Sequence, residues 1–360
     1  MFHVRQITPD DLPEAHRLTV NLYYYHSGLR YESLLTEAEF VDLFELGYLN
    51  GLVLTYAETQ EHGTAKKAKP IGCMIYHSTV SNVRGKGIYL DQFIILEEFR
   101  RRGLGQTMMT RLCQICQENR DKFIQLIFRK GLPVEKLYTR LGFENCTMLP
   151  PRLHELQVIG KTELKKMIDK GATLEDTRLD SLVKLIIPFG ASENCKSRTW
   201  TALNDANPEC HCCQQNKLCH LRAQNIILAE KKLERSDVSK MCTFVEKTIV
   251  CSWGGPLVTF SDFVGDKSLL SPGVLCSRLR CWSTMHPNLG GAVWEVPCEV
   301  NNKDKQNACP LICSLKQLNV IDGTIHEGWN NCYLDEAGIR RMSELSIPEN
   351  TTLFDKISFD

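Results

Sequence analysis

The chain lacks an excess of charge of either sign, since its 360 residues carry 43 basic and 43 acidic side chains. A balanced chain has no general positive field that would gather nucleic acid or anionic lipid. It also lacks a run of about 18 apolar residues, the length that a membrane-spanning helix needs. Met1–Gln6 shows none of the apolar core of a signal peptide. These absences predict a protein of the cytosol or nucleus with no membrane partner and no general nucleic-acid binding.

Length and composition predict more than one folded domain. With 43% hydrophobic and 24% charged residues, the chain resembles ordinary globular proteins. Single cores stop growing well below 360 residues, so two domains are expected. We expect a first domain at residues 1–170, a connecting helix and linker at 171–208, and a cysteine-rich α+β module at 209–360. Within that module, Ala223–Met241 is predicted to be helical, and Asp335 is predicted to cap a last helix.

Cysteine is abundant, and 13 of the 17 cysteines follow residue 190. In a reducing compartment such residues are thiols or metal ligands more often than disulfides. A compact group has the ligand types of a tetrahedral structural zinc site. Its members are Cys210, Cys213, Cys219 and His220. The alternative is a set of ordinary thiols. Cys113 and Cys116 share the apolar face of a predicted helix, so we interpret them as core residues.

The first domain has a mixed α/β pattern. The residues predict a strand, two helices, a three-strand meander, a glycine turn, and then helix, strand, helix and strand. Ile88–Leu96 is almost wholly apolar, as in a central strand, and Leu104 begins an amphipathic helix. Between them lies the turn Arg100–Gly105 (RRRGLG). Its glycines let backbone amides approach a ligand, and a helix N-terminus together with arginines favours a pyrophosphate.

This R-x-x-G-x-G turn resembles the coenzyme A signature of the GCN5-related N-acetyltransferase (GNAT) superfamily. Three further stretches resemble diamine (spermidine/spermine) acetyltransferases over residues from about 4 to 167. They are Leu35–Glu37, Tyr89–Phe93 and Tyr138–Phe143. The resemblance implies a GNAT fold, acetyl-CoA as cofactor, and pairing of the first domain with a copy of itself.

The same resemblance implies roles for individual residues. Asp91 matches the general base and Tyr138 the acid that protonates the coenzyme A thiolate. The expected cofactor-binding residues are Phe93, Ile94, Ile95, Arg100, Arg101, Arg102, Gly103, Leu104, Gly105 and Gln106. Three positions depart from the diamine enzymes. They are Gln92 in place of a second carboxylate, Gly131 in place of an asparagine, and Tyr23–Ser27 in place of an acidic loop. A polycation needs paired carboxylates, so these departures weigh against a polyamine.

The predicted activity is acetyl transfer from acetyl-CoA to a small, diamine-like primary amine. One alternative is a protein-lysine acetyltransferase whose C-terminal module binds the protein partner and selects the target. Another is a binding protein that keeps the acetyltransferase fold as a scaffold. The C-terminal module has no second R-x-x-G-x-G. The sequence therefore leaves open whether that module is a decayed second acetyltransferase-like unit.

Overall fold

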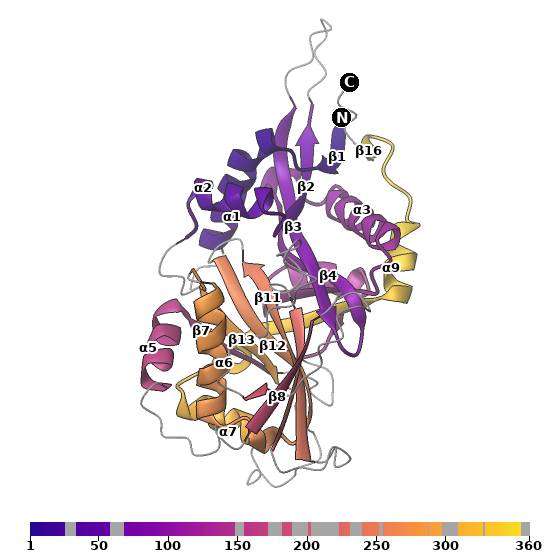
Figure 1. The fold of residues 1–360 in the computed structure, drawn as a ribbon. Helices are drawn as coiled ribbons and strands as arrows, with labels where there is room; N and C mark the ends of the chain where they lie inside the picture. The colour runs from indigo at the N-terminus through magenta and orange to yellow at the C-terminus, as the bar shows by residue number, and fades with distance from the viewer. Residues whose placement is uncertain are drawn as a thin grey trace, which may run out of the picture.

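A computed structural model describes most of the chain, and its residues form two mixed sheets of eight strands each. The described residues are 1–25, 34–57, 68–147, 155–171, 182–188, 201–202, 223–230, 240–251, 255–286, 288–296, 309–326 and 328–353. In the view of Figure 1 one sheet with its helices lies above the other. We call them the first and the second unit.

The first unit contains most of the N-terminal elements. They are β1 (Phe2–Gln6), α1 (Leu12–Tyr25), α2 (Glu37–Glu45), β2 (Asn50–Tyr56), β3 (Lys69–Ser81), β4 (Gly85–Ile95), α3 (Leu104–Glu118), β5 (Phe123–Arg129), α4 (Val134–Arg140) and β6 (Glu144–Asn145). Its strand order is β16-β1-β2-β3-β4-β5-β15-β6. Helix α3 buries Met108, Leu112, Cys113 and Cys116 against this sheet, which confirms the predicted packing role of the two cysteines.

The remaining elements follow in chain order. They are β7 (Glu155–Gly160), α5 (Lys161–Gly171), β8 (Leu182–Pro188), β9 (Thr201–Ala202), β10 (Ala223–Glu230), β11 (Met241–Cys251), β12 (Gly255–Gly265), α6 (Pro272–Met285), β13 (Gly291–Val296), α7 (Pro310–Gln317), β14 (Ile321–Asp322), α8 (Gly323–His326), β15 (Trp329–Asp335), α9 (Glu336–Ser343) and β16 (Thr351–Leu353). The second sheet has the order β9-β8-β10-β11-β12-β13-β7-β14.

The two sheets share one topology. In the first sheet, three antiparallel pairings lead from β1 to β4, and β4 then pairs in parallel with β5. In the second sheet, three antiparallel pairings lead from β8 to β12, and β12 then pairs in parallel with β13. An antiparallel strand then follows in each sheet, β15 beside β5 and β7 beside β13. Helix α3 connects the first parallel pair and α6 the second. The second unit is therefore a mixed α/β module that repeats the architecture of the first.

The first sheet receives the strands β15 and β16 and the helix α9 from the C-terminal end of the chain, whereas every strand of the second sheet lies between residues 155 and 322. β15 lies between β5 and β6 of the first sheet, with Trp329 opposite Arg129 and Asp335 opposite Phe123. β7 lies between β13 and β14 of the second sheet. The helix that follows β15 and the helix that follows β7 pack in the same unit as their strand, α9 on α3 and α5 on α6 (Figure 1). The expected boundary at residue 170 therefore does not match the sheets, because pairing between distant segments decides which unit a strand joins.

The predicted helix at Ala223–Met241 is wrong. Residues 223–230 form β10, held between β8 and β11 by antiparallel pairing on both sides. Ile226 and Leu228 are both fully buried, with the two-residue spacing of a strand face. Tertiary pairing thus overrides the helix propensity of the Ala, Leu, Glu and Lys residues in this stretch. The capping prediction for Asp335 is confirmed, since its side chain accepts a hydrogen bond from Gly338 N at 2.7 Å.

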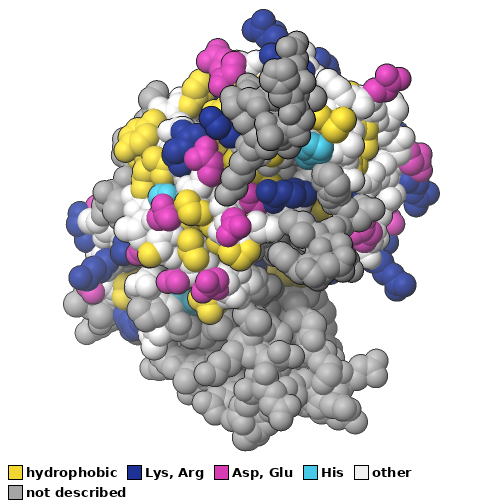
Figure 2. All heavy atoms as spheres, turned by 90° about the horizontal axis from the view of Figure 1, so that it is seen from above, with side chains coloured by type: hydrophobic (Ala, Val, Ile, Leu, Met, Phe, Trp, Pro, Cys, Tyr) yellow, Lys and Arg dark blue, Asp and Glu magenta, His cyan; other side chains and the backbone are white. Residues whose placement is uncertain are grey.

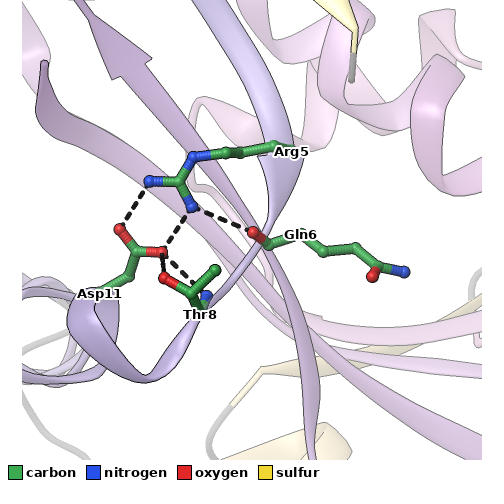
Figure 3. A network of polar contacts seen from close by, with 4 residues as sticks. All are labelled: Arg5, Gln6, Thr8 and Asp11. Atoms are coloured by element: carbon green, nitrogen blue, oxygen red, sulfur yellow. Dashed lines mark hydrogen bonds and ion pairs between the residues drawn. The ribbon is translucent and has the colours of Figure 1, made fainter. Parts of the chain in front are cut away.

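The start of α1 is fixed by a charged network at the edge of the first unit (Figure 3). Arg5 donates from two nitrogens to the two carboxylate oxygens of Asp11, at 2.5 and 2.9 Å. Thr8 donates to Asp11 Oδ2 from its backbone N at 2.8 Å and from its hydroxyl at 2.7 Å. Although burial acts to raise the pKa of Asp11, these hydrogen bonds outweigh it and lower that pKa.

The face of the molecule that is seen from above in Figure 2 carries acidic and basic side chains intermixed. This arrangement agrees with the balanced net charge of the sequence. In the part of the chain that the structure describes, no helix is both long and apolar enough to cross a membrane.

The two units meet through an apolar cluster and a buried polar network. Tyr89 of β4 packs with Ile249, Leu257 and Val293 of the second sheet. In the polar network, the carboxylate of Glu295 accepts hydrogen bonds from Gln125 Nε2 at 2.8 Å and from Tyr333 Oη at 3.1 Å. The Asp262 carboxylate accepts one from Asn82 N at 2.8 Å. These contacts fix the second sheet against the open side of β4, where the candidate site lies.

Candidate functional site

The site begins where β4 and β5 separate. Their parallel pairing covers Ile88–Leu90 of β4, whereas β4 itself continues to Ile95. At the end of this pairing a register shift leaves Asp91 as an extra residue, because Leu90 faces Tyr76 and Gln92 faces Ile75. Such a bulge redirects the strand and its side chains. The edge of β4 from Phe93 to Ile95 is thus left open toward a ligand that could pair with it as a strand does.

The glycine turn follows this open edge. Gly103 is the N-cap of α3 with φ of 77°, a left-handed value that side chains disfavour, and no side chain caps the helix. The first turn of α3 therefore presents backbone amides and the positive end of the helix dipole. Arg100 Nε donates to Ile95 O at 2.8 Å, and Arg102 donates to Glu98 O at 3.0 Å. Arg101 is exposed.

One cavity of about 1090 Å³ joins the open strand and the glycine turn. Nine of the ten expected cofactor-binding residues line it. They are Phe93, Ile94, Ile95, Arg100, Arg101, Gly103, Leu104, Gly105 and Gln106. Arg102 is the exception, because its guanidinium lies over the ring of Phe99 and contacts the backbone of Glu98. Both expected catalytic residues, Asp91 and Tyr138, also line this cavity.

Tyr138 comes from α4 and is packed by aromatic rings. Its ring centroid lies 5.7 Å from that of Phe128 and 5.5 Å from that of Phe143. Burial raises the pKa of Tyr138, because the phenolate would lose its solvation. The hydroxyl therefore keeps its proton across the physiological range. A protonated phenol on the wall of a cavity can donate that proton to a basic group inside it.

Asp91 is half-buried beside two residues of its own strand. Gln92 Nε2 donates to Asp91 Oδ2 at 3.4 Å. Burial raises the pKa of Tyr89 most, and the negative charge of Asp91 raises it further. A carboxylate at a strand bulge, facing a cavity, can accept a proton from a bound ammonium group.

The sequence analysis missed that the second unit builds part of the wall. Its lining residues are Gly160, Thr248, Ile249, Cys251, Gly255, Pro256, Leu257, His286, Asn288, Gly290, Ala292, Val293 and Ile321. Lys161, at the start of α5, also lines the cavity, as do Glu39 and Asp42 of α2. No local signal marks these residues, because only the docking of the two units brings them to the cavity.

The corresponding turn of the second unit is closed by its own side chains. Helix α6 begins after Ser271, whose hydroxyl accepts a hydrogen bond from Val274 N at 3.3 Å, and Pro272 follows at the first position. Leu270 and Val274 beside it are fully buried. Where β12 and β13 separate, the buried rings of Phe260 and Trp294 stack at 5.3 Å. This helix start therefore lacks the exposed glycine turn of α3.

The predicted zinc ligands Cys210, Cys213, Cys219 and His220 lie outside the described residues, so that site stays a prediction. Within the described part of the chain, no three His, Cys, Asp or Glu side chains are grouped as metal ligands would be.

Comparison with known proteins found one family match and a number of similar solved structures. Residues 27–143 match the model of the Acetyltransferase (GNAT) family. A tandem GNAT protein from the clavulanic acid biosynthesis pathway is similar at 10% identity and a TM-score of 0.43, over 93% of this chain and 99% of that one. A Brucella melitensis GNAT acetyltransferase, solved with acetyl-CoA, matches at 18% identity and a TM-score of 0.30, over 40% of this chain and 83% of that one. Arabidopsis thaliana NAA60, solved with a bisubstrate analogue, matches at 17% identity and a TM-score of 0.31, over 40% and 85% respectively.

Proposed function

We propose, with the GNAT fold of the first unit as the premise, that the protein transfers acetyl from acetyl-CoA to a small, diamine-like primary amine. One observation carries the proposal. An open strand edge and an uncapped glycine turn lie in the same cavity as a carboxylate and a protonated phenol. Binding of the cofactor alone would not require Asp91 and Tyr138 at that place.

The residues present suit acetyl-CoA. The left-handed Gly103 and the free first turn of α3 fit a pyrophosphate, which would accept hydrogen bonds from backbone amides. Arg100 and Arg101 add positive charge on the same side. The open backbone of Phe93–Ile95 would hold the pantetheine arm as a neighbouring strand would. When bound, acetyl-CoA supplies a thioester, which is an acetyl group already activated for transfer to an amine.

The chain's own residues would manage the protons. A primary amine arrives as an ammonium ion and must become neutral before it can act as a nucleophile. Asp91 would accept that proton at its carboxylate. The Tyr138 hydroxyl holds the proton that a thiolate leaving group needs, and the buried ring keeps it positioned. Because both groups line the same cavity, their orientation toward the bound reactants would supply the rest of the rate.

The test measures consumption of acetyl-CoA by the full chain against diamines, polyamines, thialysine and histone peptides. We expect turnover with small amines. Tyr138→Phe should keep the fold and coenzyme A affinity but reduce turnover by roughly 10²–10⁴-fold, the usual contribution of a positioned acid. Tyr76→Phe is the matched control, since Tyr76 is similarly buried but does not line the cavity.

The other outcomes separate the alternatives. Turnover with histone peptides alone would indicate a protein-lysine acetyltransferase. Coenzyme A binding without transfer to any amine or peptide would indicate a scaffold. Unchanged turnover in Tyr138→Phe would remove the acid role while leaving the activity.

A further inference from the structure

The C-terminal segment between α9 and β16, residues 344–350, lies along helix α3. At one end of it, Gln114 Nε2 of α3 donates a hydrogen bond to the backbone O of Ser343, the last residue of α9, at 3.3 Å. Further along, a Cβ placed on Gly103, the N-cap of α3, would lie 3.6 Å from Pro348 Cγ. The segment therefore returns along α3 from its C-terminal half to the glycine turn, before the chain joins the first sheet as β16 beside β1 (Figure 1).

The end of this segment is anchored to the first strand of the chain. Pro348 O accepts a hydrogen bond from Thr351 N at 2.9 Å, which closes a turn. Asn350 O accepts one from Phe2 N at 2.9 Å, and the parallel pairing of β16 with β1 follows directly. The segment is thus held at both ends, by α9 on α3 and by β16 on β1. These two attachments fix the place of the Pro348 ring beside the start of α3.

Strand β1 also supports the residue that precedes the glycine turn. The ring of Phe99 lies edge-on to that of Phe2, with centroids 6.3 Å apart, and 5.5 Å from that of Tyr56. The guanidinium of Arg102, within the turn, lies 5.5 Å from the centroid of the Phe99 ring. The turn therefore has two supports outside the cavity, Pro348 directly and the β1 rings through Phe99.

The backbone of the glycine turn needs such support. Gly103 has φ of 77° and Arg101 has φ of 62°, so two of its residues lie in the left-handed region. For arginine this conformation costs free energy, and it persists where the surrounding structure holds it. Gly103 lines the cavity, whereas Pro348 does not. Pro348 thus contacts the turn from outside and leaves the cavity open to a ligand.

We propose that Pro348 is a positioning residue for the cofactor, and that the C-terminal segment holds the glycine turn in the conformation that binds it. Pro348 acts through Gly103, on the backbone amides that would meet a pyrophosphate. A turn that is already ordered binds more tightly, because binding then costs less conformational entropy. The inference rests on the proposed function, which assigns this turn to coenzyme A. It adds that the C-terminal end of the chain sets the affinity of that site.

The test compares coenzyme A affinity with the opening of the turn in the free protein. Pro348→Ala removes the Cγ atom that faces Gly103 and should weaken coenzyme A binding by about 3- to 10-fold in calorimetry. Without cofactor, the same variant should accelerate amide hydrogen exchange at Thr107, whose N–H donates to Gly103 O at 3.1 Å. In turnover measurements KM for acetyl-CoA should rise while kcat stays unchanged, because saturating cofactor restores the ordered turn.

Two other chains sharpen the assignment. Leu345→Ala alters an exposed residue of the same segment and should change neither affinity nor exchange. A chain of residues 1–346 keeps α9 but lacks Pro348 and β16, so it should lose more affinity than Pro348→Ala. Residues 1–353 should bind coenzyme A as the full chain does.

The inference is overturned if exchange at Thr107 is unchanged in Pro348→Ala, or if this variant keeps the wild-type affinity for coenzyme A. Weaker binding with unchanged exchange would mean that Pro348 contacts the cofactor itself and does not position the turn. Faster exchange in a chain that binds no coenzyme A would support the positioning role and contradict the proposed function alone. Acetyl transfer with unchanged affinity and exchange in Pro348→Ala would contradict this inference alone.

Discussion

The two units share a topology but differ at the turn from the fourth core strand into the following helix. In the first unit, Gly103 leaves the start of α3 uncapped and open to the cavity. In the second, Ser271 and Pro272 close the start of α6, and buried neighbours cover it. The same strand order therefore leaves the helix start open in one unit and sealed in the other.

This difference shows that the shared strand order does not by itself determine whether the helix start is open to a ligand. The strands of both units separate beyond their parallel pairing, at Leu90 and at Phe260. In the second unit the aromatic rings of Phe260 and Trp294 are stacked and buried at that place. Asp262 lies in the register shift between β11 and β12, and its carboxylate binds Asn82 of the first unit. Positions that line a cavity in one unit thus serve packing in the other.

The largest effect should come from removing the C-terminal elements that complete the first unit. A chain of residues 1–170 lacks β15 and α9, so β5 loses a paired strand along its whole length and α3 loses a covering helix. We expect this fragment to show no cooperative thermal transition by circular dichroism and to bind no coenzyme A. Residues 1–353, which retain β16, are the control and should melt like the full chain. Cooperative folding of residues 1–170 would show that the first unit does not need these C-terminal elements.

A second prediction concerns the core of the second unit. Glu246 and Arg278 form a buried ion pair with two hydrogen bonds, at 2.7 and 2.6 Å. Glu246→Leu leaves a buried guanidinium uncompensated and should lower the free energy of unfolding by about 3–5 kcal/mol in a urea titration. The double variant Glu246→Leu with Arg278→Met should recover most of that loss. A single variant as stable as the wild type would show that the pair contributes little.

Local patterns predicted the elements of the first unit well. The glycine turn at Gly103 and the cap at Asp335 each depend on residues close in sequence, and the structure has both. The cavity residues expected from the resemblance also come together, with the exception of Arg102. Whether each performs its expected role stays a prediction.

Non-local pairing could not be predicted in the same way. Nothing within Trp329–Asp335 indicates that it lies beside β5, some 200 residues earlier in the chain. β10 has helix-forming residues, yet two neighbouring strands decide its conformation. His286 reaches the cavity only because the second sheet docks on β4. These features depend on which surfaces of the folded units are complementary, and that complementarity cannot be read from the local patterns of a single sequence.

A smaller effect, dependent on pH, should appear at the edge of the first unit. Asp11→Asn weakens the hydrogen bonds from Arg5 and Thr8 and should cost about 1–2 kcal/mol at pH 7. These bonds lower the pKa of Asp11 in the folded protein. The stability that its carboxylate contributes is therefore complete above the pKa of the unfolded state and is lost as pH falls through the pKa of the folded state. Urea titrations should therefore show the two proteins converging below about pH 4. A difference that persists in acid would contradict the assignment.

The smallest effect should come from the closed turn itself. Ser271→Ala removes the cap of α6 and should lower stability by about 1 kcal/mol. Because we assign no cofactor to that helix start, coenzyme A affinity should not change. Calorimetry on this variant therefore sharpens the comparison, since a weakened affinity would mean that the second helix start also contacts the cofactor.

The stoichiometry of coenzyme A binding tests the central claim most directly. Calorimetric titration of the full chain should give one site per chain, assigned to the glycine turn of α3. Gly103→Asp adds a side chain and a negative charge there and should weaken binding by about 10²-fold or more, or about 2.7 kcal/mol. Gly131→Asp is the matched control, because Gly131 has a similar φ of 83° and open space around its Cβ position but does not line the cavity. One site that is lost in Gly103→Asp and kept in Gly131→Asp is the predicted result. Two sites per chain, or one that survives Gly103→Asp, would contradict it.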